Sequence, residues 1–301
     1  MDSALIESVR RFNRTVTQRI GALDDSFLSR GRPLGQARLL WEIGPAGARI
    51  RALRSRLGLD SGYLSRMLRA LEAEGLITVS AADDDKRVRA VRLTQAGLAE
   101  RAELDRRSDE MAAAVLRPLT SRQRDRLTAA MDEAGLLLTA SMIEIAATDP
   151  RHPHARFCLQ AYFTELASRF DSGFDPARSI PAAEKDLIPP AGVLLVATLH
   201  DEPVGCGALK YHGAGPAEVK RMWVSPAVRG LGLGRRLLGE LEVSAAAHRI
   251  RVLRLETNRA LTEAIELYRS AGYREVGAFN TEPYAHHWFE KTLSPDSTAL
   301  S

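Results

Sequence analysis

The sequence predicts an α/β protein with two domains, the first mainly helical and the second built from alternating strands and helices. Its 301 residues suffice for two domains of ordinary size. Apolar residues recur at helical spacing through residues 1–146, whereas residues 156–294 contain short apolar strands separated by helices and glycine turns. The polar segment 147–155, with two prolines, predicts a linker between them, and residues 295–301 predict a flexible tail.

The composition is that of a globular protein, with 45% hydrophobic and 27% charged residues. No apolar run reaches the roughly 18 residues that span a membrane, and the N-terminus lacks the apolar core of a signal peptide. Cys158 and Cys206 form neither a disulfide framework nor a zinc set, which favours a cytoplasmic location. His152 and His154 have no third ligand nearby, so we expect no metal site.

In the first domain, periodic apolar residues predict helices that end at glycine or proline or begin at a capping side chain. The expected helices are 3–22, 34–43, 48–57, 61–74, 95–117 and 121–146. Alternating residues at 76–79 and 88–93 predict two strands joined by a charged turn. Two short helices around a glycine turn, followed by a β-hairpin, make a winged helix-turn-helix, which is a DNA-binding motif.

Three segments of this domain carry a family pattern. They are LGLDSGYLSRMLRALEAEGLI at 57–77, the wing tip DDDKR at 83–87 and the strand-to-helix join RLTQAG at 92–97. With these segments, residues 1–146 resemble the MarR family of transcription regulators. The resemblance implies a homodimer built from the first and last helices. It also implies a double-stranded DNA operator, with one recognition helix per subunit in the major groove and the wing in the minor groove.

The resemblance assigns DNA contacts to the recognition helix and the wing. They are Ser61, Tyr63, Ser65, Arg66 and Arg69 on the helix, and Lys86, Arg87 and Arg89 at the wing. Arginine suits base edges and narrow minor grooves, whereas hydroxyl groups suit phosphates. Asp83 or Asp85 would orient the wing arginine. Alternatively, Arg66 and Arg69 form the solvated face of an amphipathic helix.

The second domain is predicted to follow an α/β order. Its expected helices are 157–170, 235–247 and 260–270, and its expected strands are 192–199, 204–212, 217–224, 251–258, 273–279 and 286–293. The first of these strands, GVLLVATL, is apolar throughout, which is typical of a buried strand.

The stretch EVKRMWVSPAVRGLGLGRRLLGELE, residues 218–242, predicts a strand, a glycine-rich loop and a helix. Glycines let backbone N–H groups approach a ligand closely, and the start of a helix adds N–H donors and a partial positive charge. Together these features predict a binding site for a pyrophosphate. The spacing matches neither the dinucleotide fingerprint G-x-G-x-x-G nor the nucleotide loop G-x-x-x-x-G-K-S/T. The alternative is a flexible turn before a surface helix.

The spacing Arg229-x-x-Gly232-x-Gly234, between a strand and a leucine-rich helix, resembles the pyrophosphate motif of the GNAT acyl-CoA N-acetyltransferases. The α/β order of residues 156–294 is similar to that family throughout. The resemblance implies a mixed central sheet and acetyl-CoA as the cofactor. It assigns cofactor binding to Met222, Trp223, Val224, Arg229, Gly230, Leu231, Gly232, Leu233, Gly234, Arg235 and Asn258.

Acetyl transfer to an amine needs an unprotonated nucleophile, donors for the developing oxyanion, and a proton or dipole for the departing thiolate. The resemblance makes Glu218 the base, acting through a water, and Tyr268 the acid beside the acyl-CoA sulfur. Alternatively, Glu218 is a strand carboxylate paired with Lys220 or Arg221, and Tyr268 is a packed helix aromatic.

Two loops are candidates for the acceptor wall. Arg169 would hold a carboxylate of the acceptor, and an apolar side would come from Phe170, Phe174, Tyr284 and Trp288. Alternatively, these aromatic side chains pack in the core or in a lid.

Taken together, these patterns predict a transcription regulator that also acetylates the amino group of a small molecule, an amino acid or another amine. One alternative is a DNA-binding sensor of acyl-CoA or of a metabolite, with little turnover. Another alternative is a protein lysine acetyltransferase.

Overall fold

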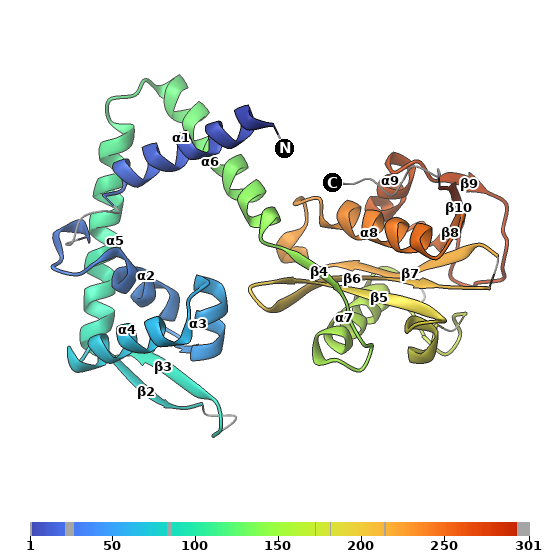
Figure 1. Cartoon of the computed structure of the whole chain (residues 1–301), viewed down its shortest axis with the longest axis horizontal. Coiled ribbons are helices and arrows are strands. Elements are labelled where there is room, and N and C mark those ends of the chain that lie inside the picture. The colour runs from blue at the N-terminus through green and yellow to red at the C-terminus, as the bar shows by residue number, and fades with distance from the viewer. Residues whose placement is uncertain are drawn as a thin grey trace. The chain divides into compact units, whose positions relative to one another are not determined.

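A computed structural model describes residues 2–21, 27–82, 86–171, 173–180, 182–213 and 215–293. The chain divides into two compact units, Met1–Asp132 and Glu133–Ser301, and each is described by itself (Figure 1). Within the described residues, no helix is long and apolar enough to cross a membrane. The expected tail and the wing residues Asp83 and Asp85 lie outside the described residues.

The first unit contains a small antiparallel sheet and mainly helices. Its helices are α1 (Ser3–Arg19), α2 (Leu34–Ile43), α3 (Ile50–Leu57), α4 (Ser61–Ala73), α5 (Gln95–Leu116) and α6 (Ser121–Ser141), which continues into the second unit. Its strands are β1 (Ala48–Arg49), β2 (Ile77–Ala81) and β3 (Arg89–Leu93), in the order β1-β3-β2. The predicted winged helix-turn-helix is therefore confirmed, with α3 and α4 preceding the β2–β3 hairpin.

One segment of this unit differs from the prediction, because Ala48 and Arg49 form a strand instead of starting a helix. They pair with Val91 and Ala90 of β3. The preceding Gly47 has a φ of 79°, a left-handed conformation that interrupts a helix and brings the chain against β3. Helical periodicity does not reveal such a turn.

The recognition helix α4 begins and packs as its sequence predicts. Its N-cap Asp60 accepts a hydrogen bond from the backbone N–H of Tyr63, with a distance of 2.8 Å. The helix then buries one stripe of side chains in the core shared with α2 and α3: Leu64, Met67, Leu68 and Leu71. Each burial contributes about 1.5–3 kcal/mol, and the opposite face of α4 is left in solvent.

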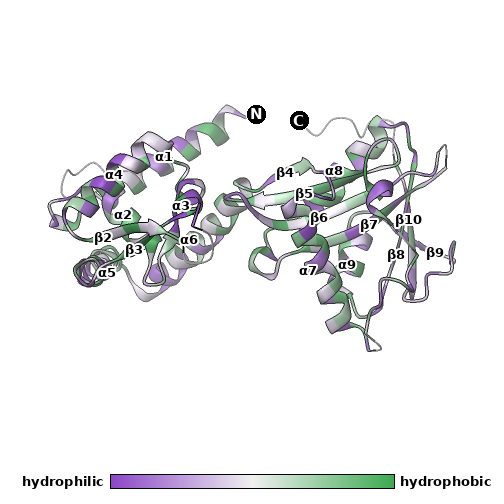
Figure 2. Ribbon diagram, turned by 90° about the horizontal axis from the view of Figure 1, so that it is seen from below, coloured by the Kyte–Doolittle hydropathy of each residue, from purple (hydrophilic) through white to green (hydrophobic). Residues whose placement is uncertain are grey.

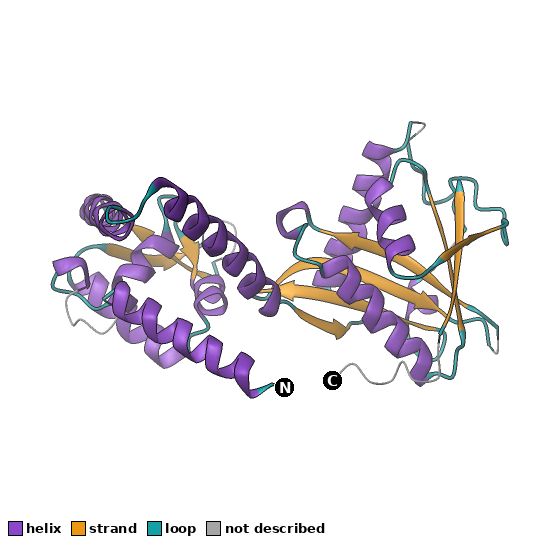
Figure 3. Cartoon of the chain, turned by 90° about the horizontal axis from the view of Figure 1, so that it is seen from above, coloured by secondary structure: helices purple, strands orange, loops and turns teal. Residues whose placement is uncertain are grey.

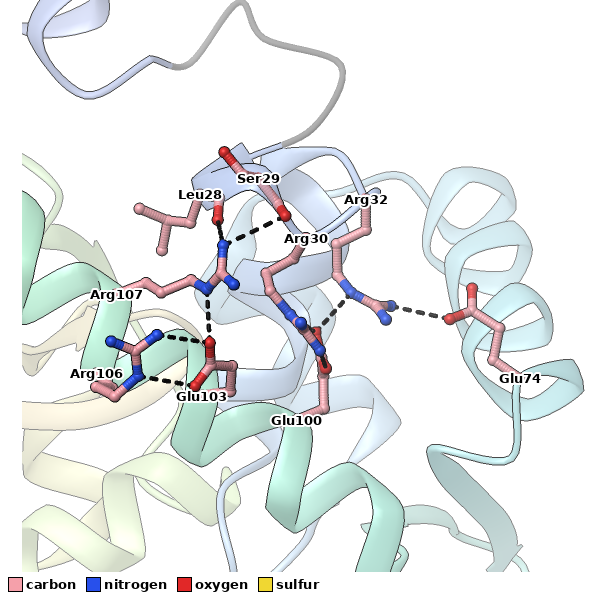
Figure 4. Close-up of polar contacts among 9 residues, drawn as sticks. All are labelled: Leu28, Ser29, Arg30, Arg32, Glu74, Glu100, Glu103, Arg106 and Arg107. Atoms are coloured by element: carbon pink, nitrogen blue, oxygen red, sulfur yellow. Dashed lines mark hydrogen bonds and ion pairs between the residues drawn. The ribbon is translucent and has the colours of Figure 1, made fainter.

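A network of arginines and carboxylates joins the short 3-10 helix η1 (Phe27–Ser29) and the turn after it to α5 (Figure 4). Glu100 on α5 is 8% exposed and contacts the guanidinium groups of Arg30 and Arg32, the latter through Nε at 3.1 Å. Arg32 also pairs with Glu74, the C-cap of α4, at 3.0 Å. The bond from Arg30 is the main reason that the pKa of Glu100 lies below its usual value. The network therefore ties the end of α4 to α5.

The described part of the second unit forms a seven-stranded mixed sheet that is covered by helices on both faces (Figures 1 and 3). Its strands are β4 (Glu144–Ala147), β5 (Gly192–Leu199), β6 (Glu202–Lys210), β7 (Ala217–Val224), β8 (Val252–Thr257), β9 (Arg274–Val276) and β10 (His287–Thr292), in the order β4-β5-β6-β7-β8-β10-β9. Its helices are α7 (Pro153–Arg169), α8 (Leu233–Ala247) and α9 (Thr262–Ser270). The expected mixed central sheet is confirmed, because β7 and β8 are parallel while the other neighbours are antiparallel.

The two faces of the sheet have separate cores because successive side chains of β5 point to opposite sides. Leu194 and Val196 pack with Cys158 of α7, on one face. Val193 and Leu195 belong to the cluster that contains the leucines of α8, on the other face. The helices α7 and α8 thus sandwich β5 and β6, and the loop before α8 is held over the carboxyl end of β7.

The chain after α6 differs from the predicted helix 121–146 and linker 147–155. The helix ends at residue 141, and β4 pairs with β5 at the edge of the second sheet. Ile143 is buried in the second core, and Arg236 of α8 donates hydrogen bonds to the carbonyls of Ala140 and Ile143 at 2.7 and 3.0 Å. The first bond occupies a carbonyl in the last turn of α6, the second holds the residue just before β4, and a β-branched residue at this place suits a strand. The second sheet therefore begins before the expected linker.

Candidate active site

The parallel strands β7 and β8 separate toward their carboxyl ends. Within the described residues they pair at two positions, Ala217 with Leu253 and Glu218 with Arg254. Further along, β7 remains paired with β6, and a bulge there includes Arg221, whose φ is 58°. Bulges commonly bend a strand beside a functional site. The edge of β7 that faced β8 thereby opens onto a groove.

A cavity of about 670 Å³ lies at the end of β7, next to the glycine loop. Its walls include most of the predicted cofactor residues: Met222, Trp223, Val224, Arg229, Gly230, Gly232, Leu233, Gly234 and Arg235. The N-cap of α8 is Gly232, with a φ of 74° that favours glycine. The first turn of α8 therefore points its N–H groups and positive dipole end at the cavity. Leu231 instead packs against the hydrophobic core.

Glu165 of α7 is the acceptor for three donors on the wall of this cavity. Its carboxylate lies 2.6 Å from Arg229 Nη2 and 3.0 Å from Trp223 Nε1. Arg169 Nη1 is 3.4 Å away, and Arg169 also pairs with Glu263 at 2.7 Å, which raises its pKa. Arg169 therefore lines this larger cavity, away from the acceptor wall on which we expected it. An anion that binds Arg229 competes with Glu165.

Tyr268 of α9 lines the larger cavity and also a smaller neighbour of about 90 Å³. The ring is 6% exposed and packs near Tyr273 and Phe289, with centroid distances of 6.1 and 6.0 Å. Burial raises the pKa of the Tyr268 hydroxyl above its usual value. The phenol therefore keeps its proton at neutral pH, as a group that donates to a departing thiolate must.

The smaller cavity combines aromatic rings with carboxylates. Three of the predicted acceptor residues, Phe170, Phe174 and Tyr284, line it and lie within 4.8–5.9 Å of one another by ring centroids. Asn258 lines it too, and its side chain bonds the carbonyl of Tyr284 at 2.7 Å. The fourth predicted aromatic residue, Trp288, is not among the described residues that line either cavity. Its Nε1 donates to Asn280 Oδ1 at 2.9 Å.

A line of charged side chains leads from the smaller cavity toward the surface. Lys220 of β7 is 9% exposed and contacts the carboxylates of Glu256 and Glu218, the latter at 3.1 Å. Glu218 in turn lies 3.4 Å from Nε2 of the half-exposed His212. Desolvation opposes the charge of Lys220, but the two carboxylates raise its pKa above the usual value. Lys220 is therefore an ammonium that bridges the two glutamates.

Of the two carboxylates that pair with Lys220, Glu256 and not the expected Glu218 reaches the smaller cavity. Glu256 lines the smaller cavity, whereas Glu218 does not occur in the described lining of either cavity and stands behind Lys220. The contact between Glu218 and Lys220 agrees with the alternative interpretation, in which Glu218 is a strand carboxylate that pairs with a neighbouring cation. Sequence reasoning missed Glu256, although a charged residue at the carboxyl end of a strand beside a glycine loop is a usable signal. It also missed Glu165 and Glu282, for which no motif exists.

In the first unit, the predicted DNA-contacting residues are all exposed. On α4 they are Ser61, Tyr63, Ser65, Arg66 and Arg69, and at the wing they are Lys86, Arg87 and Arg89. The Arg66 guanidinium lies 5.7 Å from the centroid of the Tyr63 ring, and Arg69 Nε donates to the carbonyl of Ser65 at 3.3 Å. The exposed positions on α4 therefore form a polar face that carries Arg66 and Arg69, and the wing carries three further exposed cations.

Two segments of the chain match family models. Residues 190–275 match the acetyltransferase (GNAT) domain, and residues 34–88 match the MarR family. The first segment contains β5 to β8, the glycine loop and Tyr268, and the second contains α2, α3 and α4. Both resemblances noted in the sequence are thereby confirmed.

A protein named IAA acetyltransferase from Azospirillum brasilense is 43% identical over 91 residues, which are 30% of this chain and 58% of that protein. The chain spans less than three-fifths of the length of this relative and of two other curated relatives that it matches. A GNAT family acetyltransferase structure from Staphylococcus aureus is 17% identical, covers 50% of this chain and 99% of its own, and has a TM-score of 0.44. A "probable transcriptional regulator" from Pseudomonas aeruginosa is 24% identical over 43% of this chain and 98% of its own, with a TM-score of 0.37.

Proposed function

We propose that this chain, which combines a MarR family domain with a GNAT acetyltransferase domain, transfers an acetyl group from acetyl-CoA to the amino group of a small molecule and binds a double-stranded DNA operator as a homodimer. The observation that carries the enzymatic half is the position of Tyr268. It lines both the cavity beside the glycine loop and the cavity that contains Glu256. The groove therefore offers an anion-binding site at the glycine loop, a proton donor in Tyr268 and a proton acceptor in Glu256.

The larger cavity fits the pyrophosphate and pantetheine of acetyl-CoA. Arg229 would supply a positive charge by exchanging its ion pair with Glu165 for the pyrophosphate. The first turn of α8 supplies N–H donors, and three glycines line the wall without side chains: Gly230, Gly232 and Gly234. The opened edge of β7 at Met222 and Val224 offers backbone groups to an extended chain, as in strand addition. Acetyl-CoA would supply the acetyl group as an activated thioester.

In the proposed chemistry, the bound ammonium first loses one proton to water, and the free amine attacks the thioester carbon. Glu256 then accepts the second proton that the nitrogen loses, and Tyr268 gives its proton to the sulfur that leaves. The new carbon–nitrogen bond replaces the carbon–sulfur bond, so one proton passes to the enzyme and one leaves it. Lys220 holds the Glu256 carboxylate in place by an ion pair. The family resemblance made Glu218 the base. Because Glu218 lies behind Lys220, it would act only indirectly, through Lys220 and a water.

Replacing Tyr268 by phenylalanine tests this function. We expect kcat for acetyl-CoA-dependent thiol release with a panel of small amines to fall about 10²-fold, because positioned acid catalysis contributes about 10²- to 10⁴-fold. The KM for acetyl-CoA should change little, since the ring and its packing remain. Tyr273→Phe removes a hydroxyl from a neighbouring buried ring that is absent from the described cavity linings, so it should keep full kcat. Unchanged kcat in Tyr268→Phe would exclude the acid role.

The exposed basic face of α4 and the wing support the proposed DNA binding. Arg66 and Arg69 alternate with the buried stripe of α4, so they point away from the core. Arginine side chains in this position are suited to base edges in the major groove. The wing adds further exposed cations, among them Arg89 of β3.

The double variant Arg66→Ala/Arg69→Ala should weaken binding to an operator duplex selected from a random library by the full-length protein. We expect the free energy of DNA binding to weaken by about 1–3 kcal/mol for each arginine that contacts a base. For each arginine that contacts a phosphate, we expect the slope of log K against log salt concentration to fall in magnitude by about 1. Fluorescence anisotropy at several salt concentrations measures both quantities. Arg274→Ala, an exposed arginine on β9 in the second unit, is the control. Equal affinity and slope in the double variant and the control would place DNA elsewhere.

The proposed homodimer is supported by the apolar surface of α1. Figure 2 shows hydrophobic residues along this helix between hydrophilic ones. None of the residues in α1 is buried in the single chain, and the exposed apolar side chains are Leu5, Ile6, Val9 and Phe12, at 45–63% exposure. An exposed apolar stripe of this kind marks an interaction surface, and a helix packed on a partner copy would cover it.

A further inference from the structure

We propose that the acetyl acceptor is a small primary monoamine that carries an aromatic or branched apolar group and no carboxylate. The inference rests on the proposed acetyl transfer and specifies the substrate class of the same site. It follows from three features of the smaller cavity: a buried carboxylate with neutral partners, cations that are already engaged, and a wall of aromatic rings.

The buried carboxylate is Glu282, which is 8% exposed and lines the smaller cavity. One of its oxygens accepts hydrogen bonds from the Ser179 hydroxyl at 2.9 Å and from the Ile180 N–H at 2.6 Å. The other accepts from the Tyr284 N–H at 3.3 Å. All these donors are neutral, and no ion pair joins Glu282 to a cation in the described part of the chain. Because a buried charge is costly without a counter-charge, an ammonium in this cavity would complement it.

The cations in the described lining of the cavity, Lys220 and Arg221, already have partners. Lys220 bridges Glu256 and Glu218 and therefore already balances carboxylate charge. The Arg221 guanidinium lies over the ring of Phe163, 4.7 Å from its centroid, and its Nη2 is 3.5 Å from the carbonyl of Ala182. The described lining of the cavity has two carboxylates, Glu256 and Glu282, and two cations. Because Glu218 adds a third carboxylate at Lys220, this lysine is shared between two carboxylates, whereas Glu282 has no ion pair within the described residues. The local charge favours a monocation over a zwitterion.

The apolar group of the acceptor would contact the rings of Phe170, Phe174 and Tyr284. Their centroids lie 4.8–5.9 Å apart, so they form one continuous aromatic wall. Such rings also attract an ammonium placed over their faces. A cavity of about 90 Å³ suits a single ring or a branched alkyl group and is small for an oligosaccharide. The exposed Arg178 lies over the Tyr284 ring, 5.9 Å from its centroid, and is the nearby cation that a remote carboxylate would reach.

The test compares 2-phenylethylamine with L-phenylalanine, which share a ring and chain and differ by one carboxylate. Full-length protein is assayed for acetyl-CoA-dependent thiol release, and the binding of each compound is measured by calorimetry. We expect kcat/KM to be at least about tenfold higher for the amine, because a carboxylate beside Glu256 and Glu282 meets like charge. Equal or better use of phenylalanine would overturn the inference and direct attention to Arg178 and Arg221.

Two variants identify the residues responsible. Glu282→Gln should raise the KM for 2-phenylethylamine about tenfold and reduce its preference over phenylalanine, with an unchanged KM for acetyl-CoA as the check on folding. Phe174→Leu should lower kcat/KM for 2-phenylethylamine more than for isoamylamine. An unchanged preference in Glu282→Gln would count against the proposed charge recognition.

The measurements also separate this inference from the proposed function. Preferential binding of 2-phenylethylamine without thiol release would overturn acetyl transfer and keep the ligand class. Thiol release with polyamines or aminoglycosides, and no binding of either phenyl compound, would keep acetyl transfer and overturn the ligand class.

Discussion

Replacing Glu256 by glutamine is expected to lower kcat for acetyl transfer by about 10²- to 10⁴-fold, the range that a positioned proton acceptor contributes. Glutamine has nearly the same shape as glutamate, so the cavity and the bond to Asn280, at 3.3 Å in the native chain, are retained while the proton acceptor is lost. Lys220 would keep one carboxylate partner, Glu218. Steady-state thiol release against amine concentration and pH measures the effect, which should fall on kcat more than on KM.

The companion variant Glu218→Gln decides between the two candidate bases. If Glu256 is the base, Glu218→Gln should lower kcat less than Glu256→Gln, because Glu218 acts behind Lys220. Glu290→Gln is the matched control, since this strand carboxylate pairs with Arg254 at 2.7 Å and does not occur in the described lining of either cavity. A larger loss in Glu218→Gln than in Glu256→Gln would restore Glu218 as the base and make Glu256 its positioning partner.

Replacing Glu100 by alanine should lower the free energy of unfolding of the first unit by about 3–5 kcal/mol, the typical result of removing one partner from a buried ion pair. Arg32 is 9% exposed and would lose the carboxylate that lies 3.1 Å from its Nε. Urea unfolding of the full-length protein, followed by hydrogen exchange in peptides of α2 and α5, reports this unit separately from the other. Glu110→Ala, which removes an exposed partner of Arg106, should cost much less than Glu100→Ala, because water screens exposed ion pairs.

The effect of Glu100 should depend on pH in a defined direction. Its pKa is lower in the folded unit than in the unfolded chain, first because of the bond from Arg30. A lowered folded pKa contributes stability that is present above the unfolded value, about 4.3 for glutamate, and is lost as pH falls through the folded value. The difference between wild type and Glu100→Ala should therefore shrink below about pH 4. A difference that stays constant down to pH 2 would show that Glu100 acts through packing alone.

Local features of the sequence determined much of this protein. The apolar stripe of α4 and the Asp60 cap specify a helix and its buried face, because spacing and capping act within a few residues. The glycine spacing around Gly232 likewise predicts a left-handed turn before a helix, with its N–H groups free for an anion. The two family resemblances rest on such short-range patterns, and both model matches agree with them.

The tertiary structure decided which distant residues meet. Periodicity shows that β7 and β8 are strands, but the place where they separate depends on register and on the bulge at Arg221, which involve three strands at once. That separation brings Glu256 to the cavity and leaves Glu218 behind Lys220. The strand β4 was missed for the same reason, since Ile143 becomes a core residue only beside β5 and α8. Pairing and burial depend on neighbours far along the chain, so only the folded structure could decide them.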